Sequence, residues 1–440
     1  MMHDSAPAST RRDFLKASSS TAIGATLVSS LPFPTETSAA GPGDKLKIGF
    51  IGCGGRGTGA ANQALSADSN VELYAMGDVF DEKIEKSLDT LQRQFPDQPH
   101  KFNVAKERQF TGLDAYQKVI RSGVDVVILT TPPGFRPLHF KAAVEAGKHC
   151  FLEKPMATDA PGVRSVIESV KKAKEKKLAV CAGFCWRYDA ARRAIFKEVH
   201  HGRIGEIKTI YATYLTGPVK PMAPAGTRPA GMSDVEWQVR NWYNFGWLSG
   251  DGLVEQAVHS VDKIAWAMKD RMPFKCTAVG GRMTPNHEGN IYDHIEVNYE
   301  WSSGVRAFMA QRQITGCHGE NRDYIYGSKG NAYVGRRGGS AVEIIGASPW
   351  KYTGPTPDMH QVEHDEFFAS VRAGRPVNDG DRMATSTMMS IMGRMAAYTG
   401  QEITWEQALN SQEKLVPDQL SWDMNLPMAP LAVPGQKKFV

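Results

Sequence analysis

Short apolar runs alternate with predicted helices in the first third of the chain. The expected strands are residues 47–51, 71–76, 124–129 and 149–152. The expected helices are residues 58–65, 116–122 and 139–146. This alternation predicts an α/β fold with a doubly wound parallel sheet, in which the crossovers between strands are right-handed.

The composition is that of a globular protein. Of the 440 residues, 41% are hydrophobic and 22% are charged, which excludes a disordered or collagen-like chain. The length suggests two or three domains, and we expect two. The net charge of +5 is spread along the chain, so no nucleic-acid partner is expected. No apolar stretch reaches the roughly 20 residues needed to cross a bilayer, so we expect no stable membrane insertion.

The first 40 residues are predicted to be a signal peptide. Arg11 and Arg12 are followed by Phe-Leu-Lys, by a mildly apolar run at residues 17–31, and by Ser-Ala-Ala ending at Ala40. This layout is typical of the twin-arginine (Tat) export route. The alternative, a disordered basic tail, does not explain the apolar run and the small residues together. We expect cleavage near Ala40 and a periplasmic or otherwise exported protein. Because this route carries proteins that are already folded, often around a cofactor, a bound cofactor is also expected.

The cysteines do not indicate a disulfide framework. There are six, at positions 53, 150, 181, 185, 276 and 317, and we expect them to be free and buried. Cys181 and Cys185 fall in an expected strand at residues 178–186. At the rise of about 3.3 Å per residue in a strand, their Cα atoms would lie about 13 Å apart, too far for a disulfide.

A glycine-rich turn connects the first expected strand to the first expected helix. Gly52, Gly54 and Gly57 occupy the glycine positions of a Gly-x-Gly-x-x-Gly motif, and Gly55 and Arg56 lie between them. The first glycine permits the tight turn, the second lets the backbone approach a pyrophosphate, and the third permits close helix–strand packing. The following helix N-terminus adds amide donors for the same anion. The motif therefore predicts a dinucleotide-binding domain.

The second expected strand indicates which dinucleotide is bound. It leads to Asp78, which lies 21 residues after Gly57. This is close to the spacing of about 20 at which an acidic side chain binds a ribose diol, and it favours NAD. An ordinary turn residue is the alternative for Asp78. Arg56 leaves NADP open as the cofactor.

Two later strands lead into loops expected to border the same site. Thr130 and Pro132 follow the third strand, and Glu153 and Lys154 follow the fourth. Ligands of open parallel sheets bind beyond these carboxyl ends. Pro155 favours an extended backbone at Lys154 and restrains the direction of its side chain. A surface lysine before a turn is the alternative.

These motifs resemble the Gfo/Idh/MocA oxidoreductases. The resemblance rests on the glycine motif, on Val-Ile-Leu-Thr-Thr-Pro at residues 127–132, and above all on Gly-Lys-His-x-Phe-x-Glu-Lys-Pro at residues 147–155. Further matches lie at residues 183–188, at residues 202–207, and in a helix that carries Glu255 and His259. The resemblance covers about residues 45–409.

The resemblance implies a domain organisation. We place an NAD(P)-binding Rossmann domain at residues 45–160 and an α/β domain with a large, mostly antiparallel open sheet at residues 161–410. Open sheets of this family usually pair between subunits, which implies a homodimer or homotetramer. The proline-rich residues 411–440 are expected to form an extended arm that could wrap a neighbouring subunit.

Residues 251–268 are predicted to form one helix with a polar stripe beside its apolar one. Glu255, His259 and Asp262 make up the polar stripe. Because residues four apart share a helix face, Glu255 is expected to meet His259 and orient its imidazole. A solvated helix edge is the alternative from spacing alone. The resemblance implies that the acidic residue and the histidine face the nicotinamide. Many members carry aspartate at the position of Glu255, so His259 is the firmer catalytic candidate.

Substrate contacts are predicted in two segments. Arg187 and Tyr188 follow the expected strand at 178–186, and Trp242 and Tyr243 lie in an aromatic-rich segment. Aromatic rings stack on sugars, although such residues more often belong to a core.

The sequence His-Gln-Val-Glu-His at 360–364 spells a metalloprotease pattern. It opens an amphipathic helix that fits the family's C-terminal region, so no metal site is expected.

The leading hypothesis is hydride transfer between a sugar or cyclitol hydroxyl carbon and a nicotinamide. His259 would act as general base and Lys154 would stabilise the developing alkoxide. Since no pool of free cofactor is replenished outside the cytoplasm, we expect the cofactor to be tightly retained and recycled within each cycle. A redox-neutral, NAD-dependent glycosidase acting on a glycoside is the second hypothesis. A sugar-binding protein without catalysis is the third.

Overall fold

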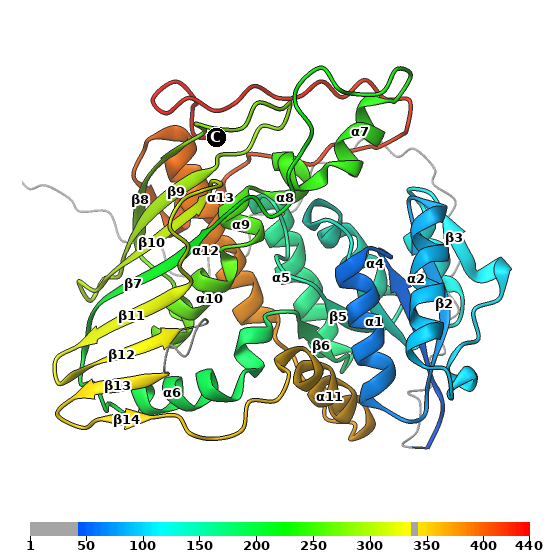
Figure 1. The fold of residues 1–440 in the computed structure, drawn as a ribbon, viewed down its shortest axis with the longest axis horizontal. Coiled ribbons are helices and arrows are strands. Elements are labelled where there is room, and N and C mark those ends of the chain that lie inside the picture. The colour runs from blue at the N-terminus through cyan, green and yellow to red at the C-terminus, as the bar shows by residue number, and fades with distance from the viewer. Residues whose placement is uncertain (1–42, 336–341) are drawn as a thin grey trace, which may run out of the picture. The chain divides into compact units, whose positions relative to one another are not determined.

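Two β-sheets organise the part of the chain that this computed structural model describes, residues 43–335 and 342–440 (Figure 1). The predicted signal peptide at residues 1–40 lies outside the described residues. Among the described residues, no helix is both long enough and apolar enough to span a membrane.

The first sheet has six parallel strands in the order β3-β2-β1-β4-β5-β6. The strands are β1 (Leu46–Ile51), β2 (Val71–Asp78), β3 (Gln109–Thr111), β4 (Val126–Leu129), β5 (His149–Leu152) and β6 (Val180–Ala182). This is the strand order of a dinucleotide-binding Rossmann domain. The four strands expected from the sequence are confirmed, and the sheet continues to β6, beyond residue 160.

Helices cover both faces of this sheet. Leu73, Ile128 and their neighbours pack against one group of helices, which consists of α1 (Gly55–Ala67), α2 (Asp81–Gln94) and α11 (Met359–Arg372). Val127 and Leu129 face the other group, which consists of α3 (Ala115–Arg121), α4 (Arg136–Glu145) and α5 (Ala160–Glu175). Burial on both faces explains why β4 reads as an uninterrupted apolar run rather than an alternating one.

The second sheet has nine strands in the order β14-β13-β12-β11-β7-β10-β9-β8-β15. All neighbouring strands are antiparallel except β7 and β10, which run parallel. The strands are β7 (Ile207–Thr216), β8 (Lys275–Gly281), β9 (His294–Glu300), β10 (Arg306–Gln313), β11 (Arg322–Gly327), β12 (Gly330–Gly335), β13 (Glu343–Gly346), β14 (Trp350–Lys351) and β15 (Ile403–Thr404). The expected large, mostly antiparallel sheet is thus confirmed.

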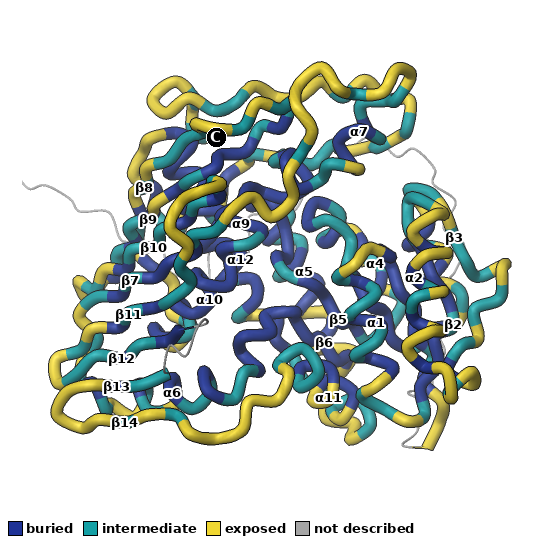
Figure 2. Tube along the Cα trace, viewed as in Figure 1, coloured by how far each residue is buried: buried dark blue, intermediate teal, exposed yellow. Residues whose placement is uncertain are grey.

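One face of the second sheet packs on helices. These are α6 (Ala190–His200), α9 (Gly252–Glu255), α10 (Val258–Ala267), α12 (Gly380–Thr399) and α13 (Trp405–Asn410). Figure 2 shows α10 and α12 as largely buried, with the sheet on one side. Helix α12 also contacts α5 and β6. Two short helices, α7 (Asp234–Arg240) and α8 (Gly246–Ser249), belong to a separate hydrophobic cluster beside the sheet.

The helix expected at residues 251–268 is instead two helices. The Asp251 carboxylate caps α9 by accepting from Leu253 N at 2.9 Å. The Ala257 amide then donates to the Gly252 carbonyl, five residues back rather than the four of an α-helix. One extra residue is thus inserted before α10 begins. Such a π-type bulge rotates the following helix relative to the preceding one.

The C-terminal arm, residues 411–440, contains no helix or strand and packs on its own chain (Figure 1). Leu426 N donates to Asp234 Oδ2 at 3.0 Å, and the Leu426 carbonyl accepts from Gln238 Nε2 at 2.6 Å. Tyr292 Oη donates to Ala432 O at 2.9 Å. The arm is thus held by α7 and by the segment before β9 of the same subunit.

All six cysteines lie in the described part of the chain and are free. Five are buried as expected, but Cys317 is exposed. The strand expected at 178–186 ends at Ala182, and Cys185 begins a 3₁₀ turn, η5 (Cys185–Tyr188). The backbone therefore turns at Gly183, whereas the sequence had predicted an extended strand through residue 186.

Candidate active site

A cleft of about 650 Å³ lies beyond the carboxyl ends of the first sheet's strands. This is where ligands bind in open α/β sheets. Residues from both sheets' domains line it, including Tyr214 of β7 and Trp242. Fourteen of the residues predicted from sequence line this one cleft: Gly52, Gly54, Gly55, Arg56, Gly57, Asp78, Thr130, Pro132, Glu153, Lys154, Trp242, Tyr243, Glu255 and His259.

The glycine turn has the geometry of a pyrophosphate cradle. Gly52 has φ of +95°, and a Cβ there would lie 2.7 Å from the Thr130 backbone. A Cβ on Gly57 would lie 2.1 Å from the Gly52 carbonyl oxygen, so the helix could not approach the strand as closely. Cβ atoms at Gly54 and Gly55 would meet only open space, on the cleft side. Among the described residues no side chain caps α1, which leaves its first amides to an anion.

Asp78 is held rigidly at the end of β2. Its carboxylate accepts from Cys53 N at 2.6 Å and from Phe80 N at 3.0 Å. Burial raises the pKa of Asp78, although these backbone hydrogen bonds oppose the rise. The side chain is therefore fixed beside the glycine turn, as a ribose-binding carboxylate must be.

Arg56 is engaged by carboxylates rather than left to bind a phosphate. Its Nε lies 2.5 Å from Glu153 Oε1, and another guanidinium nitrogen lies 3.7 Å from Glu363 Oε1. A third contact runs to Gln63 at 3.1 Å. Burial alone would raise the pKa of Glu153, but Arg56 and Lys154 outweigh it and lower this pKa. The Arg56 guanidinium, which had left NADP open as the cofactor, is thus bound by side chains of the protein itself. This arrangement favours NAD.

Lys154 contacts Glu255 twice across the cleft. Its Nζ lies 2.9 Å from Glu255 Oε1 and 2.6 Å from the Glu255 backbone oxygen. Both side chains are only 10% exposed. Glu255 therefore holds Lys154, a contact that the sequence did not predict, and the expected contact of Glu255 with His259 stays a prediction.

His259 is positioned by aromatic packing. Its ring lies 4.9 Å from the Trp186 ring at 29°, and the edge of Phe184 lies 6.3 Å away. Trp186 in turn contacts Lys263 Nζ at 4.2 Å and the Arg192 guanidinium at 4.9 Å from its ring centre. Sequence reasoning missed Trp186, which lines the cleft, although it lies within the 183–188 match to the family.

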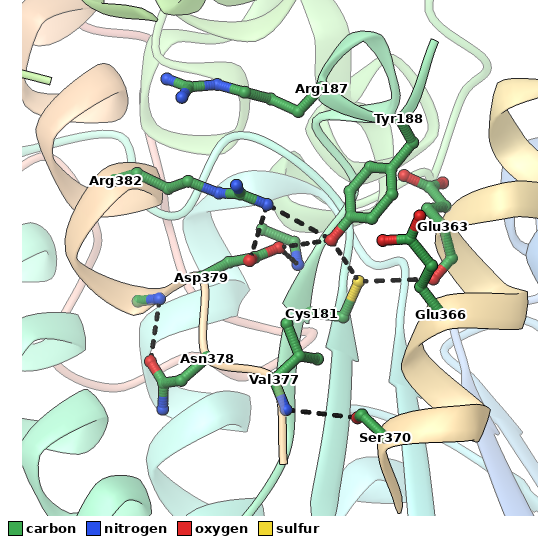
Figure 3. Close-up of polar contacts among 12 residues, drawn as sticks. Cys181, Arg187, Tyr188, Glu363, Glu366, Ser370, Val377, Asn378, Asp379 and Arg382 are labelled. Atoms are coloured by element: carbon green, nitrogen blue, oxygen red, sulfur yellow. Dashed lines mark hydrogen bonds and ion pairs between the residues drawn. The ribbon is translucent and has the colours of Figure 1, made fainter. Parts of the chain in front are cut away.

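Arg187 and Tyr188 do not line the cleft as the described residues form it. Arg187 donates from Nε and from one terminal nitrogen to the buried Asp262, each at 2.8 Å, and also contacts Asp270. Tyr188 Oη donates to Asp379 Oδ2 at 2.9 Å (Figure 3). Both side chains thus tie η5 to α10 and to the start of α12.

Sequence reasoning also missed two residues of α4, the helix that follows β4. Arg136 is fully buried and donates to the carbonyls of Leu129 at 2.7 Å and Thr131 at 2.5 Å. Burial lowers its pKa to about 10. His139 stacks on Tyr116 at 4.1 Å between ring centres, and burial lowers its pKa to about 3. Both line the cleft, and no sequence motif marks either.

The His-x-x-Glu-His pattern lies in α11 and is not arranged for a metal. His364 Nδ1 donates to the His360 carbonyl at 2.9 Å, and its ring lies 4.1 Å from Phe151. Glu363 is fully buried, and burial raises its pKa well above the usual range. Within the described ranges, no group of three metal-ligating side chains comes together. The pattern instead reflects a helix that packs against the first sheet.

Residues 46–184 match the family described as "Oxidoreductase family, NAD-binding Rossmann fold", or GFO_IDH_MocA. These residues include all six strands of the first sheet. Inositol 2-dehydrogenase of Rhizobium meliloti is 23% identical over 350 residues, which are 76% of this chain and 92% of that protein. A glycosyl hydrolase family 109 protein of Shewanella pealeana is 27% identical over 219 residues, which are 45% of this chain and 46% of that protein.

Solved structures share the arrangement of both sheets. A levoglucosan dehydrogenase in complex with NADH and levoglucosan has a TM-score of 0.64 at 18% identity, covering 82% of this chain and 99% of that one. An aldose-aldose oxidoreductase from Caulobacter crescentus, complexed with glycerol, has a TM-score of 0.63 at 19% identity with the same coverage. At this identity the likeness shows the fold. The family match and the strand order together identify residues 46–184 as an NAD-binding Rossmann domain.

Proposed function

We propose that this protein is an NAD-dependent oxidoreductase that acts on a CH–OH group of a sugar or cyclitol. The observation that carries the proposal is the joining of two sets of residues in one cleft. The glycine turn and Asp78 form a nucleotide cradle, and Lys154 and His259 lie on the same cleft's lining. Relatives named as inositol dehydrogenase and levoglucosan dehydrogenase support the substrate class.

NAD supplies a hydride acceptor when it is bound. His259, packed against Trp186, takes the proton of the substrate hydroxyl. Lys154 stabilises the negative charge that develops on the same oxygen. An ammonium has three N–H groups, and among the described residues Glu255 accepts two of those of Lys154. The third is then available to donate to the substrate oxygen.

We further propose that the enzyme is exported and keeps its cofactor. The twin-arginine pattern at Arg11 and Arg12 supports export. An exported enzyme needs a second half-reaction that regenerates the cofactor in place, such as the oxidation of one sugar and the reduction of another. The name of the aldose-aldose oxidoreductase, a protein of similar fold, is consistent with paired sugar substrates.

The test is to purify the mature protein without added cofactor, denature it, and identify the released nucleotide by mass spectrometry. Stoichiometric NAD or NADH, followed by sugar-dependent conversion between the two in the bound state, is the expected result. Stoichiometric NADP would overturn the assignment of NAD. An absence of nucleotide, together with no binding of added NADH, would overturn the enzyme proposal in favour of a non-catalytic sugar-binding protein.

A redox-neutral glycosidase is the second candidate. The match to a glycosyl hydrolase family 109 protein favours it. In this reaction a ring hydroxyl is oxidised, the aglycone is eliminated, water adds, and the ring carbonyl is reduced back, so no net oxidation occurs. Release of the aglycone from a chromogenic glycoside without added NAD would establish this function over the first.

We also propose a homodimer or homotetramer formed through the open face of the second sheet. Phe308, Tyr211, Tyr324 and Tyr333 lie opposite one another on β10, β7, β11 and β12 and form an aromatic row across four strands. Their strand neighbours Ile210 and Ala307 point to the core, so the row lies on the other face. Light scattering during gel filtration should give a dimer or tetramer mass, and Tyr324→Glu should lower it.

A further inference from the structure

One end of the cleft is bordered by residues from both the first and the second half of the chain. Phe80 lies two residues after Asp78 and lines the cleft. Arg240, at the end of α7, lines it too. Since Asp78 is placed to bind the ribose next to the adenine, Phe80 and Arg240 border the adenosine end of the cleft.

Arg240 connects α7 directly to the loop after β2. Its guanidinium carbon lies 3.8 Å from the centre of the Phe80 ring. One terminal nitrogen donates to Glu82 Oε1 at 2.9 Å, and Nε donates to Glu236 Oε1 at 2.8 Å. The arginine thus packs on an aromatic ring and pairs with a carboxylate of the nucleotide-binding side.

The C-terminal arm supports the same contact. The Trp422 ring lies 5.9 Å from the Phe80 ring at 38°. Leu420, Trp422 and Met424 pack on the hydrophobic cluster of α7 and α8, which Phe80 also joins. The hydrogen bonds of Leu426 with Asp234 and Gln238 anchor the arm to α7. Figure 1 shows the arm in red along the same end of the molecule as α7.

We propose that Phe80, Glu82, Arg240 and Trp422 form a clasp over the adenosine end of the cleft, which slows the release of bound NAD. The inference rests on the proposed function and supplies its physical means of cofactor retention. Phe80 and Arg240 border the nucleotide, whereas Glu82 and Trp422 hold these two side chains in place. The nucleotide leaves this end only when Arg240 separates from Phe80 and Glu82, so breaking the clasp raises the dissociation rate.

The experiment measures dissociation of NADH from the full mature chain by stopped-flow fluorescence after mixing with excess NAD. Trp422→Ala and Arg240→Ala are expected to raise the dissociation rate about tenfold each. Glu82→Gln is expected to raise it about twofold to fivefold, the range of an exposed ion pair. The matched control is Arg203→Ala, which removes an ion pair of 2.6 Å with Glu198 of α6 and should not change the rate.

Three outcomes separate the clasp from the proposed function. Faster release in the three clasp variants, with the control at the wild-type rate, establishes the clasp. Unchanged release in all three, from a wild-type protein that binds NADH, overturns the clasp and leaves the oxidoreductase proposal standing. No binding of NADH by the wild type overturns both. Glu82 is half exposed, so Glu82→Gln keeps the test decisive even where Trp422→Ala fails to fold.

Discussion

Two lysine–carboxylate pairs, one at the cleft and one in the core, differ in role although both are buried. Lys154 and Glu255 are each 10% exposed and border the cleft. Lys263 and Asp323 are 1% and 2% exposed and lie behind Trp186, away from the cleft lining. Lys263 follows His259 by one helical turn in α10. Burial and pairing therefore do not distinguish the two lysines, whereas their positions relative to the cleft do.

Lys154→Met, which removes the lysine of the cleft pair, should have the largest effect. Turnover is expected to fall at least about 10³-fold, because methionine cannot donate to a developing alkoxide. NADH binding should change little, since the cradle at the glycine turn is intact. The measurement is the steady-state rate on sugars that the wild-type protein converts, with the amount of bound nucleotide measured in parallel. Near-normal turnover would remove Lys154 from the catalytic residues.

Lys263→Met should act on stability instead. It leaves Asp323 as a buried carboxylate without its cation, which is expected to cost about 3–5 kcal/mol in the free energy of unfolding. Burial lowers the pKa of Lys263 to about 8, which shows how unfavourable this site is for a charge. Urea titration measures the loss, and Lys263→Met combined with Asp323→Leu should recover most of it. A single variant as stable as the wild type would contradict the expectation.

Acid should destabilise the core through His364. Burial lowers the pKa of His364 to about 3 in the folded chain from its ordinary 6.5. The unfolded chain therefore takes up this proton first as the pH falls. The histidine's contribution is complete above about pH 6.5 and is lost towards pH 3, by up to about 1.4 kcal/mol per pH unit. Unfolding free energies at several pH values should show a shallower slope for His364→Gln, and an equal slope would refute this.

Glu255→Gln should have the smallest effect of the four changes. The amide oxygen can still accept from Lys154, and the backbone oxygen of residue 255 is unchanged. Turnover is expected to fall about fivefold to tenfold, because a neutral acceptor holds an ammonium less firmly than a carboxylate does. The rate is measured beside that of Lys154→Met. A loss as large as that variant's would mean that Glu255 itself takes part in proton transfer.

The nucleotide-binding half was predictable because its signals are local. Each buried parallel strand is a short apolar run. Gly52 and Gly57 are required because a Cβ at either position would clash with nearby backbone atoms. Asp78 follows from its spacing to the glycine turn. These features need no knowledge of which distant segments meet.

The substrate side was less predictable because its contacts depend on packing between distant segments. Arg187 was predicted to reach substrate, but Asp262 and Asp270 bind its guanidinium. Trp186, one residue earlier, lines the cleft in its place. The break between α9 and α10 depends on an extra residue at Ala257, where the amino-acid periodicity gives no sign of it.

The sequence by itself determined the strand–turn–helix unit, the spacing of Asp78 and the position of Lys154 after a buried strand, since these depend on steric and polar requirements a few residues long. Only the tertiary structure decided that Lys154 meets Glu255, that Trp186 supports His259, and that the arm reaches Phe80. These contacts join residues up to several hundred positions apart. Their free energy depends on close packing and burial, and no local pattern of residues encodes which partners will meet.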